Sequence, residues 1–433
     1  MLEFGHPNFS VEGGVVNGRG GEPGELRPSW RRLRPRAGLG LWGPAFVAAI
    51  AYVDPGNVAA NLTAGARYGY LLVWVLVLAC LVAVHVQYRS AKLGLVTGRS
   101  LPELVGERLR RPARLAFWVQ AEVVAAATDV AEVVGGAIAL HLLFGTPLVL
   151  GGAIVGAASI VLLGVQRHGQ RTFEGAVVAF LAVITVGFLS SLIANPASPA
   201  AVLGGLVPRF QGTDSVLLAA SMLGATVMPH AIYLHSALAR DRHGHVTEPG
   251  QRRRLLRATR NDVVAALLVA GGVNVAMLLA AAASLAGVTG TDTIEGAHAA
   301  IGNALGPVVA GVFAVGLLAS GLASTSVGCY AGAVVMQGLL KVQVPLIVRR
   351  LVTLVPALVL LATGVDATWA LVVSQVVLSF GIPFALVALV RLTSSREVMG
   401  EEADKPLARV VSVLCAVVVV TLNLVLVALT VLS

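Results

Sequence analysis

Long apolar runs fill the chain from residue 39 to its end, and short polar segments separate them. A helix needs roughly 20 mostly apolar residues to cross a membrane. The pattern therefore predicts an all-α integral membrane protein with eleven spans. These lie near residues 39–66, 70–93, 113–142, 147–166, 173–195, 215–239, 262–287, 306–338, 346–363, 367–391 and 408–432.

The same pattern divides the chain into three parts. Residues 1–38 are rich in Gly, Pro and Arg and lack an apolar segment, which indicates a disordered cytoplasmic tail rather than a signal peptide or a span. Residues 39–391 are expected to form a ten-helix core. Residues 392–433 are expected to supply a linker and the eleventh helix.

Positive charge is unevenly shared between the connecting segments. Of the 31 Lys and Arg residues, 29 fall in the tail and in every second connection, whereas Arg67 and Arg209 are the two on the other side. Cytoplasmic loops hold the excess of positive charge. We therefore expect a cytoplasmic N-terminus and an extracytoplasmic C-terminus in the cell (inner) membrane. Because the net charge of +9 follows this topology, it does not indicate nucleic-acid binding.

The composition agrees with a membrane protein, since 57% of the residues are hydrophobic and 12% are charged. Cys80, Cys329 and Cys415 all lie in expected spans and lack the spacing of a metal site. We expect them to be reduced, structural thiols.

The first span is interrupted by Asp54-Pro55-Gly56-Asn57, with 15 residues of the run before it and 9 after it. Neither flank can cross a membrane alone, so the motif lies within one span. Pro and Gly break the helix there and release backbone carbonyls, which is tolerated where the backbone lines a cavity or binds a ligand. A buried carboxylate at this depth is costly. Asp54 is therefore expected to hold a cation.

The sixth span repeats this geometry at Met228-Pro229-His230, with 13 residues before the motif and 9 after it. Two interrupted spans, the first and the sixth, indicate two five-helix halves that enter the membrane from opposite sides. The chain is thus expected to contain an inverted repeat of residues 39–195 and 215–391.

Together the two breaks offer the Asp54 carboxylate, the Asn57 amide oxygen, the Met228 thioether and free carbonyls. Oxygen ligands alone suit Mg²⁺ or Ca²⁺, whereas an added sulfur favours softer ions such as Mn²⁺, Fe²⁺, Co²⁺ or Cd²⁺. The alternative for Met228 is ordinary core packing.

The third span carries three acids, Glu122, Asp129 and Glu132, at spacings that place them on one helix face. Buried acids of this kind mark ion or proton routes, and the alternative is hydrogen bonding between helices. His230 is expected to relay protons, although a metal ligand or a core histidine remain open. His85 and His235 are expected to be structural.

For three more polar residues in the spans, the sequence pattern does not decide between a functional and a structural role. Arg349 and Arg350 begin the ninth span, where the simplest interpretation is a positive flank on the cytoplasmic side. Gln375 in the tenth span could offer an oxygen to an ion or hydrogen-bond to a neighbouring helix.

Four segments together resemble the Nramp (natural resistance-associated macrophage protein) family of proton-coupled manganese and iron transporters, and the resemblance covers residues 39–432. They are AYVDPGNVAANLTAGARYGY, GATVMPHAIYLHSAL, GLASTSVGCYAGAVVMQGLL and SQVVLSFGIPFAL. The resemblance implies a LeuT-type fold of ten core helices plus one. Lys92, Lys341 and Lys405 are the only lysines among the 31 basic residues, and this excess of arginine indicates a GC-rich, bacterial genome. One departure is Leu322-Ala323-Ser324, where many members have Gln-Ser-Ser.

The resemblance also implies roles for individual residues. The metal ligands would be Asp54, Asn57, Met228 and Gln375, with backbone carbonyls of Ala51 and Ala225. The residues associated with proton movement would be Asp129, Glu132, His230, Arg349 and Arg350.

We therefore expect import of divalent metal ions coupled to protons, with no cofactor and no obligatory protein partner. The alternatives are a symporter of amino acids on the same architecture, which Asp54 disfavours by charge, and a magnesium transporter, which Met228 disfavours. An intramembrane enzyme is not expected, because the chain has no His-Glu-x-x-His or Gly-x-Ser-x-Gly motif.

Overall fold

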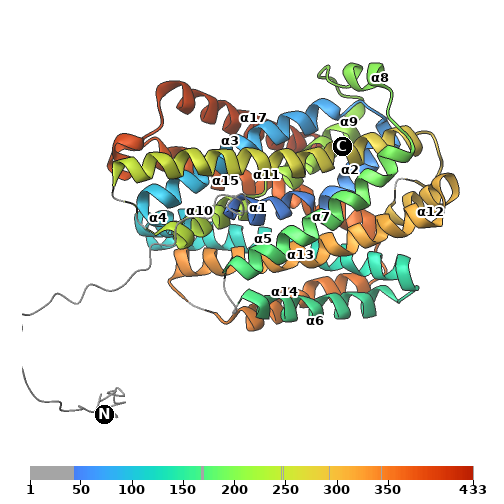
Figure 1. Ribbon diagram of the computed structural model, residues 1–433, viewed down its shortest axis with the longest axis horizontal. Coiled ribbons are helices and arrows are strands. Elements are labelled where there is room, and N and C mark those ends of the chain that lie inside the picture. The colour runs from blue at the N-terminus through green and yellow to red at the C-terminus, as the bar shows by residue number, and fades with distance from the viewer. Residues whose placement is uncertain are drawn as a thin grey trace, which may run out of the picture. The chain divides into compact units, whose positions relative to one another are not determined.

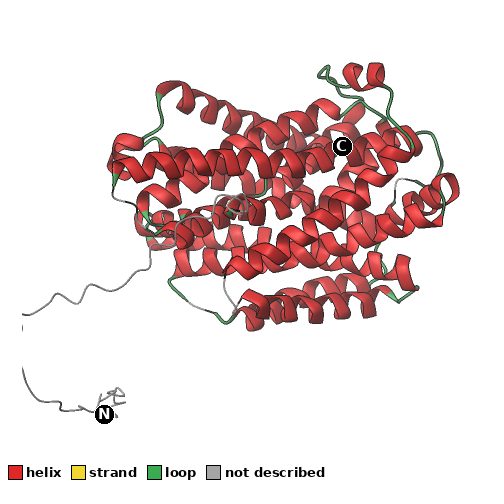
Figure 2. Cartoon of the chain, viewed as in Figure 1, coloured by secondary structure: helices red, strands yellow, loops and turns green. Residues whose placement is uncertain are grey.

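The computed structural model describes residues 43–166, 170–244, 246, 248–291, 293–342 and 344–432. All regular secondary structure in these ranges is helical (Figures 1 and 2). The expected tail at residues 1–38 and the first residues of the first span lie outside them.

The first half of the core contains an interrupted span followed by four continuous ones. A short amphipathic helix, α4, follows the second span and was not predicted from the sequence. The elements are α1 (Pro44–Ile50), η1 (Ala51–Val53), α2 (Pro55–Tyr68), α3 (Val73–Thr97), α4 (Leu101–Arg108), α5 (Arg111–Phe144), α6 (Leu148–Gln166) and α7 (Gln170–Ala194).

The second half has the same order after the short α8 (Pro199–Gly204), and further short helices occupy its loops. The elements are α9 (Gly212–Thr226), α10 (Pro229–His243), α11 (Pro249–Ser284), α12 (Ile294–Leu305), α13 (Pro307–Leu340), α14 (Leu346–Ala362), α15 (Ala367–Thr393), α16 (Arg396–Met399), η2 (Gly400–Glu402) and α17 (Pro406–Leu432). Each of the eleven expected runs contains helix. Within the described ranges, seven helices are long and apolar enough to cross a membrane.

Helix contacts relate the two halves of the core. α2 of the first half packs on α11 of the second, and its counterpart α10 packs on α3 of the first. α1 contacts α7, and its counterpart α9 contacts α15. α5 contacts α15, and its counterpart α13 contacts α7. This exchange of equivalent contacts is what a repeat of two five-helix halves produces.

The outer helices present apolar side chains away from the bundle. Figure 1 shows α6 and α14 along one edge, where they contact each other, and α17 near the opposite edge. Large exposed apolar residues include Val161 on α6, Val352 on α14 and Leu414 on α17. Exposed apolar surface on this scale is characteristic of a protein surrounded by lipid. The described residues thus form a multi-pass membrane bundle with α1 and α2 near its centre.

Candidate metal centre at the two helix breaks

Asp54 forms the N-cap of α2 at the first break. Its backbone is extended, and its carboxylate accepts hydrogen bonds from the backbone N–H groups of Asn57, at 2.9 Å, and Gly56, at 3.3 Å. Pro55 occupies the first helical turn, where its missing N–H costs nothing. The positive end of the α2 dipole therefore stabilises the carboxylate and holds it at the break.

Met228 occupies the equivalent N-cap position of α10 at the second break. Its backbone is extended, Pro229 follows in the first turn, and the side chain makes no capping hydrogen bond. The thioether is completely buried. Because a thioether cannot cap a helix as Asp or Ser can, the residue type at this position is not explained by local helix stability.

Asn57 joins the two breaks. Its Nδ2 donates to Asp54 Oδ1 at 2.7 Å and to the carbonyl of Ala225 at 2.8 Å, so α2 is tied to the end of α9. Thr226 Oγ1 lies 3.5 Å from Asn57 Oδ1. The structure therefore brings together the Asp54 carboxylate, the Asn57 amide and the Ala225 carbonyl.

Gln375 approaches the same centre from α15. Its Nε2 lies 3.5 Å from Asp54 Oδ2, and its buried Oε1 has no hydrogen-bond partner among the residues that the structure describes. Two glycines permit this approach, because a Cβ at Gly56 would overlap the Gln375 side chain and a Cβ at Gly224 would overlap its carbonyl oxygen. An unsatisfied buried amide oxygen costs free energy unless a ligand occupies it.

The proposed ligands are sealed from solvent. Asp54, Asn57, Met228 and Gln375 are at most 1% exposed. Ala51 lies buried in η1, one turn before Asp54. No group of three or more His, Cys, Asp or Glu residues able to hold a metal occurs in the described part of the chain. A centre with one carboxylate and neutral donors suits an ion that must also be released.

Two residues that the sequence analysis did not single out cap the carbonyls released at the first break. Asn274 on α11 donates to the carbonyl of Tyr52, and Ser320 on α13 donates to the carbonyl of Val53. Asn274 also accepts from Asn61 at 3.0 Å. Asn274 stands in an otherwise apolar stretch, and a lone polar residue in such a stretch is the feature of the sequence that could have indicated its role.

The acids of α5 meet the two arginines of α14. Arg350 Nη1 lies 3.2 Å from Asp129, and its Nε donates to Ser159 on α6 at 2.7 Å. Arg349 Nη2 lies 2.8 Å from Glu122. Arg350 is fully buried and Arg349 nearly so. Their side chains thus point into the bundle, which the interpretation as a simple positive flank does not explain.

Glu132 on α5 and His230 at the second break are further buried polar residues. Glu132 is 1% exposed, and its Oε2 has no hydrogen-bond partner within the described residues. His230 Nδ1 lies 3.4 Å from Thr128 Oγ1 on α5. One turn beyond Glu132, a Cβ at Gly135 would overlap Pro55. The helix that carries the acids therefore packs directly against the first break.

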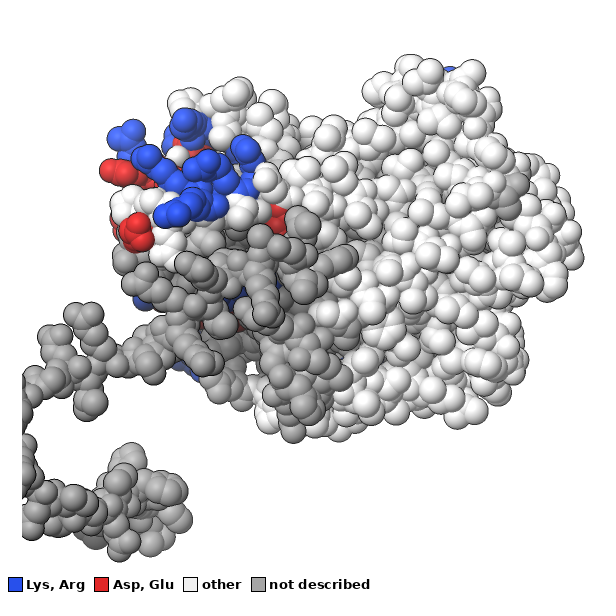
Figure 3. Space-filling model, in the orientation of Figure 1, with Lys and Arg blue, Asp and Glu red and all other residues white. Residues whose placement is uncertain are grey.

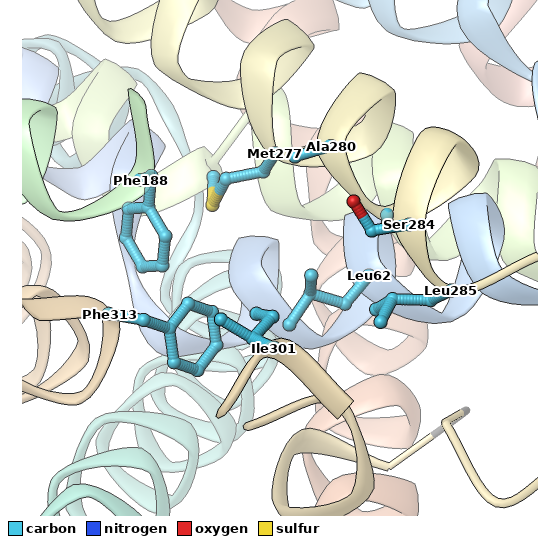
Figure 4. Close-up of a pocket in the computed structure, with 9 residues that line it drawn as sticks. Leu62, Phe188, Met277, Ala280, Ser284, Leu285, Ile301 and Phe313 are labelled. Atoms are coloured by element: carbon cyan, nitrogen blue, oxygen red, sulfur yellow. The ribbon is translucent and has the colours of Figure 1, made fainter. Parts of the chain in front are cut away.

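On the other side of the first break, apolar side chains close over α2. Leu62, Met277, Leu285, Phe188 and Phe313 surround a cavity of about 10 Å³ (Figure 4). Phe188 and Phe313 contact edge to face, with ring centroids 5.5 Å apart. The cavity is too small and too apolar to bind an ion.

Comparison with known proteins identifies relatives over nearly the whole chain. The family described as natural resistance-associated macrophage protein-like (Nramp) matches residues 45–429. The divalent metal cation transporter MntH of Mycobacterium tuberculosis is 60% identical over 414 residues, which is 95% of this chain and 96% of the relative. The protein of the same name from Bacillus subtilis is 45% identical over 388 residues, covering 89% and 91% of the two chains.

Solved structures agree with the sequence relatives. A crystal structure of the Eremococcus coleocola manganese transporter superposes with a TM-score of 0.81 at 31% identity, covering 89% of this chain and 85% of the other. Two more distant transporters, Mhp1 and MhsT, have TM-scores of 0.56 and 0.59 at 16% and 15% identity, and they cover about 90% of this chain. These two share the fold alone and confirm the expected LeuT-type arrangement.

Proposed function

The chain belongs to the Nramp family, and we propose that it imports divalent transition-metal ions together with protons, by alternating access around the two breaks. The family is one of transporters, so the expectation that the chain is not an enzyme is confirmed. The proposed ions are Mn²⁺ and Fe²⁺, with Co²⁺ and Cd²⁺ as further substrates. The names of the relatives support a divalent metal, and one of them is called a manganese transporter.

The observation that carries this proposal is the convergence at the breaks. One carboxylate, two amide side chains and a backbone carbonyl come together from α2, α9 and α15 and are all buried. The buried Met228 thioether stands at the start of α10, three residues after Ala225. Asp54 supplies charge, Asn57 and Gln375 supply neutral oxygens, and Met228 supplies the soft ligand. Gln375 Oε1 has no hydrogen-bond partner in the described part of the chain, which is consistent with a ligand position.

An arriving ion has to compete with existing hydrogen bonds. Asn57 Nδ2 donates to both Asp54 and the Ala225 carbonyl, so a cation that takes these two oxygens displaces the amide nitrogen. Asn57 can then offer its Oδ1. Because an ion replaces contacts that join α2 to α9, binding and rearrangement of the two half-spans are coupled.

The proposed proton route is separate from the metal ligands. It runs along α5 through Glu132, Asp129 and Glu122, with His230 beside the second break. Asp129 and Glu122 are paired with Arg350 and Arg349, whereas Glu132 Oε2 has no hydrogen-bond partner within the described residues. A buried carboxyl group with one oxygen left open, next to ion pairs, can accept a proton there without breaking them.

The proposed orientation places the N-terminus in the cytoplasm of the cell (inner) membrane and the C-terminus outside. On the face shown in Figure 3, Lys and Arg gather at the end of the bundle where α11 begins. Such an asymmetry matches the excess of positive charge on cytoplasmic loops.

Uptake by proteoliposomes tests the proposed function. We expect Mn²⁺ uptake that Fe²⁺, Co²⁺ and Cd²⁺ inhibit and that a 100-fold excess of Ca²⁺ or Mg²⁺ does not. Inhibition by Mg²⁺ alone would favour the magnesium transporter. Uptake of amino acids without metal uptake would favour the symporter.

The central substitution is Asp54→Asn, which removes the one full negative charge at the breaks. We expect uptake to fall to background while the protein remains folded, because no neutral group can replace a carboxylate for a divalent ion. Asp214→Asn is the matched control, since Asp214 is an exposed acid in the first turn of α9. Normal Mn²⁺ transport by Asp54→Asn would remove this residue from the site.

A further inference from the structure

A second site lies on the side of the bundle, away from the two breaks. We propose that it binds one anionic glycerophospholipid. The site is a cavity of about 650 Å³ between α4, the start of α5 and the second half of α15. Its apolar walls include Val105, Leu109, Phe117, Phe384, Val387 and Val398.

Two arginines supply the charge of this cavity. Arg108 at the end of α4 and Arg391 near the end of α15 both line it, and no acidic residue does. Both are exposed, and neither forms an ion pair within the described residues. Arg108 donates only a long hydrogen bond, at 3.5 Å, to the carbonyl of Leu104. Two exposed guanidinium groups complement a phosphate, which they can hold through charge-assisted hydrogen bonds.

The apolar part of the cavity extends along α15. Phe384 precedes Arg391 by seven residues, which corresponds to about 10 Å of helix. Phe384 and Val387 are 48% and 43% exposed, so this wall faces outward. The cavity therefore offers positive charge at one end and an apolar surface along its length. A ligand that uses both has a negative head and an acyl chain.

The walls are built to keep their shape. Phe117 packs edge to face against Phe384, with centroids 6.3 Å apart, and against Tyr233 on α10, at 6.2 Å. Pro383 stands beside Gly381, where a Cβ would contact Pro229 at 3.0 Å. These aromatic contacts and the two arginines that line the cavity distinguish the site from a purely apolar groove.

Competing ligands would use only part of the site. Inorganic phosphate would contact the arginines and leave the apolar wall uncovered. Phosphatidylcholine would cover the wall, but its choline group would place a positive charge near both guanidinium groups. We therefore expect phosphatidylglycerol to bind more tightly than either.

Native mass spectrometry of the full-length protein in detergent tests this site. Phosphatidylglycerol, phosphatidylcholine and inorganic phosphate are titrated separately, and the first bound molecule is followed. We expect Arg108→Gln with Arg391→Gln to weaken the first phosphatidylglycerol by about tenfold for each guanidinium removed. The control is Arg253→Gln with Arg257→Gln, which removes two exposed arginines on α11 that do not line the cavity.

A second variant keeps the arginines and fills the cavity. Ala388→Trp places an indole against the apolar wall and is expected to remove the tightly bound phosphatidylglycerol. Loss of binding in both cavity variants, with the α11 control unchanged, would establish the site. Parent-like binding in both cavity variants would overturn the proposal. Equal loss in the control, or equal affinity for phosphatidylcholine, would also overturn it, because charge or apolar contact alone would then explain binding. The readout does not depend on metal transport.

Discussion

Removing the Asp129 carboxylate tests whether the buried acids of α5 carry protons or only hold helices together. Asp129 is 3% exposed and lies 3.2 Å from Arg350, which is itself fully buried. Asp129→Asn leaves this guanidinium with Ser159 as its remaining polar side-chain partner. Breaking a buried pair by removing one partner costs about 3–5 kcal/mol. We therefore expect a clear drop in the thermal unfolding midpoint.

The double variant Asp129→Asn with Arg350→Met separates stability from function. It removes both charges, so part of the lost stability should return, because replacing a whole buried ion pair by apolar groups is often neutral. Proton movement should not return, since the carboxyl group is still absent. A double-mutant cycle on the unfolding midpoint then gives the coupling between the two side chains.

The decisive assay measures acidification inside liposomes alongside Mn²⁺ uptake. In both variants we expect proton influx to fall severalfold while Mn²⁺ binding persists, because the proposed metal ligands lie at the breaks and not on this face of α5. Glu401→Gln, on the exposed η2 turn, controls for the loss of an acid elsewhere. Unchanged acidification in the double variant would refute the reasoning and leave Asp129 as a structural partner of Arg350.

Two further predictions concern the metal site. Met228→Ala should retain part of the Mn²⁺ transport, lose about tenfold or more in Cd²⁺ affinity and begin to admit Ca²⁺, because water can replace the thioether as a ligand but is not a soft ligand. Uptake of Mn²⁺ in competition with Cd²⁺ and Ca²⁺ measures these changes. Continued exclusion of Ca²⁺ would show that selectivity comes from cavity size. Gly56→Ala should abolish uptake, because the new Cβ overlaps the Gln375 side chain and pushes its amide away from Asp54. Gly272→Ala on α11 is the control, since a Cβ there meets open space. Normal uptake by Gly56→Ala would exclude Gln375 from the site.

Much of the fold follows from the sequence because lipid imposes a simple length rule. Each apolar run near 20 residues contains helix, and Pro55 and Pro229 mark the two breaks, because each stands in the first turn of the helix that follows. The short helices α4 and α12 were missed because they lie in connections between the spans and are far shorter than the length that identifies a span. Ser100 and Glu103 in fact form a capping box at the start of α4, a local signal that predicts a helix terminus.

The site was only partly predictable, because its parts meet through tertiary packing. The break motifs indicate which residues of α2 and α10 are polar at membrane depth. They do not indicate that Asn274 and Ser320, far along the chain, cap the carbonyls of Tyr52 and Val53. The inward direction of Arg349 and Arg350 was equally hard to predict. A basic pair at the start of a helix has the same sequence pattern whether it faces solvent or points into the bundle.

These caps restrict where an ion can bind. Tyr52 and Val53 each have a carbonyl that already accepts from a neighbouring helix, and the Ala225 carbonyl accepts from Asn57. Asn274 and Ser320 are fully buried and belong to α11 and α13. Asn57 instead belongs to α2, which itself forms the break. The contact easiest to exchange for a metal is therefore the one that joins the two half-spans, so an ion that binds there necessarily changes how α2 and α9 are held together.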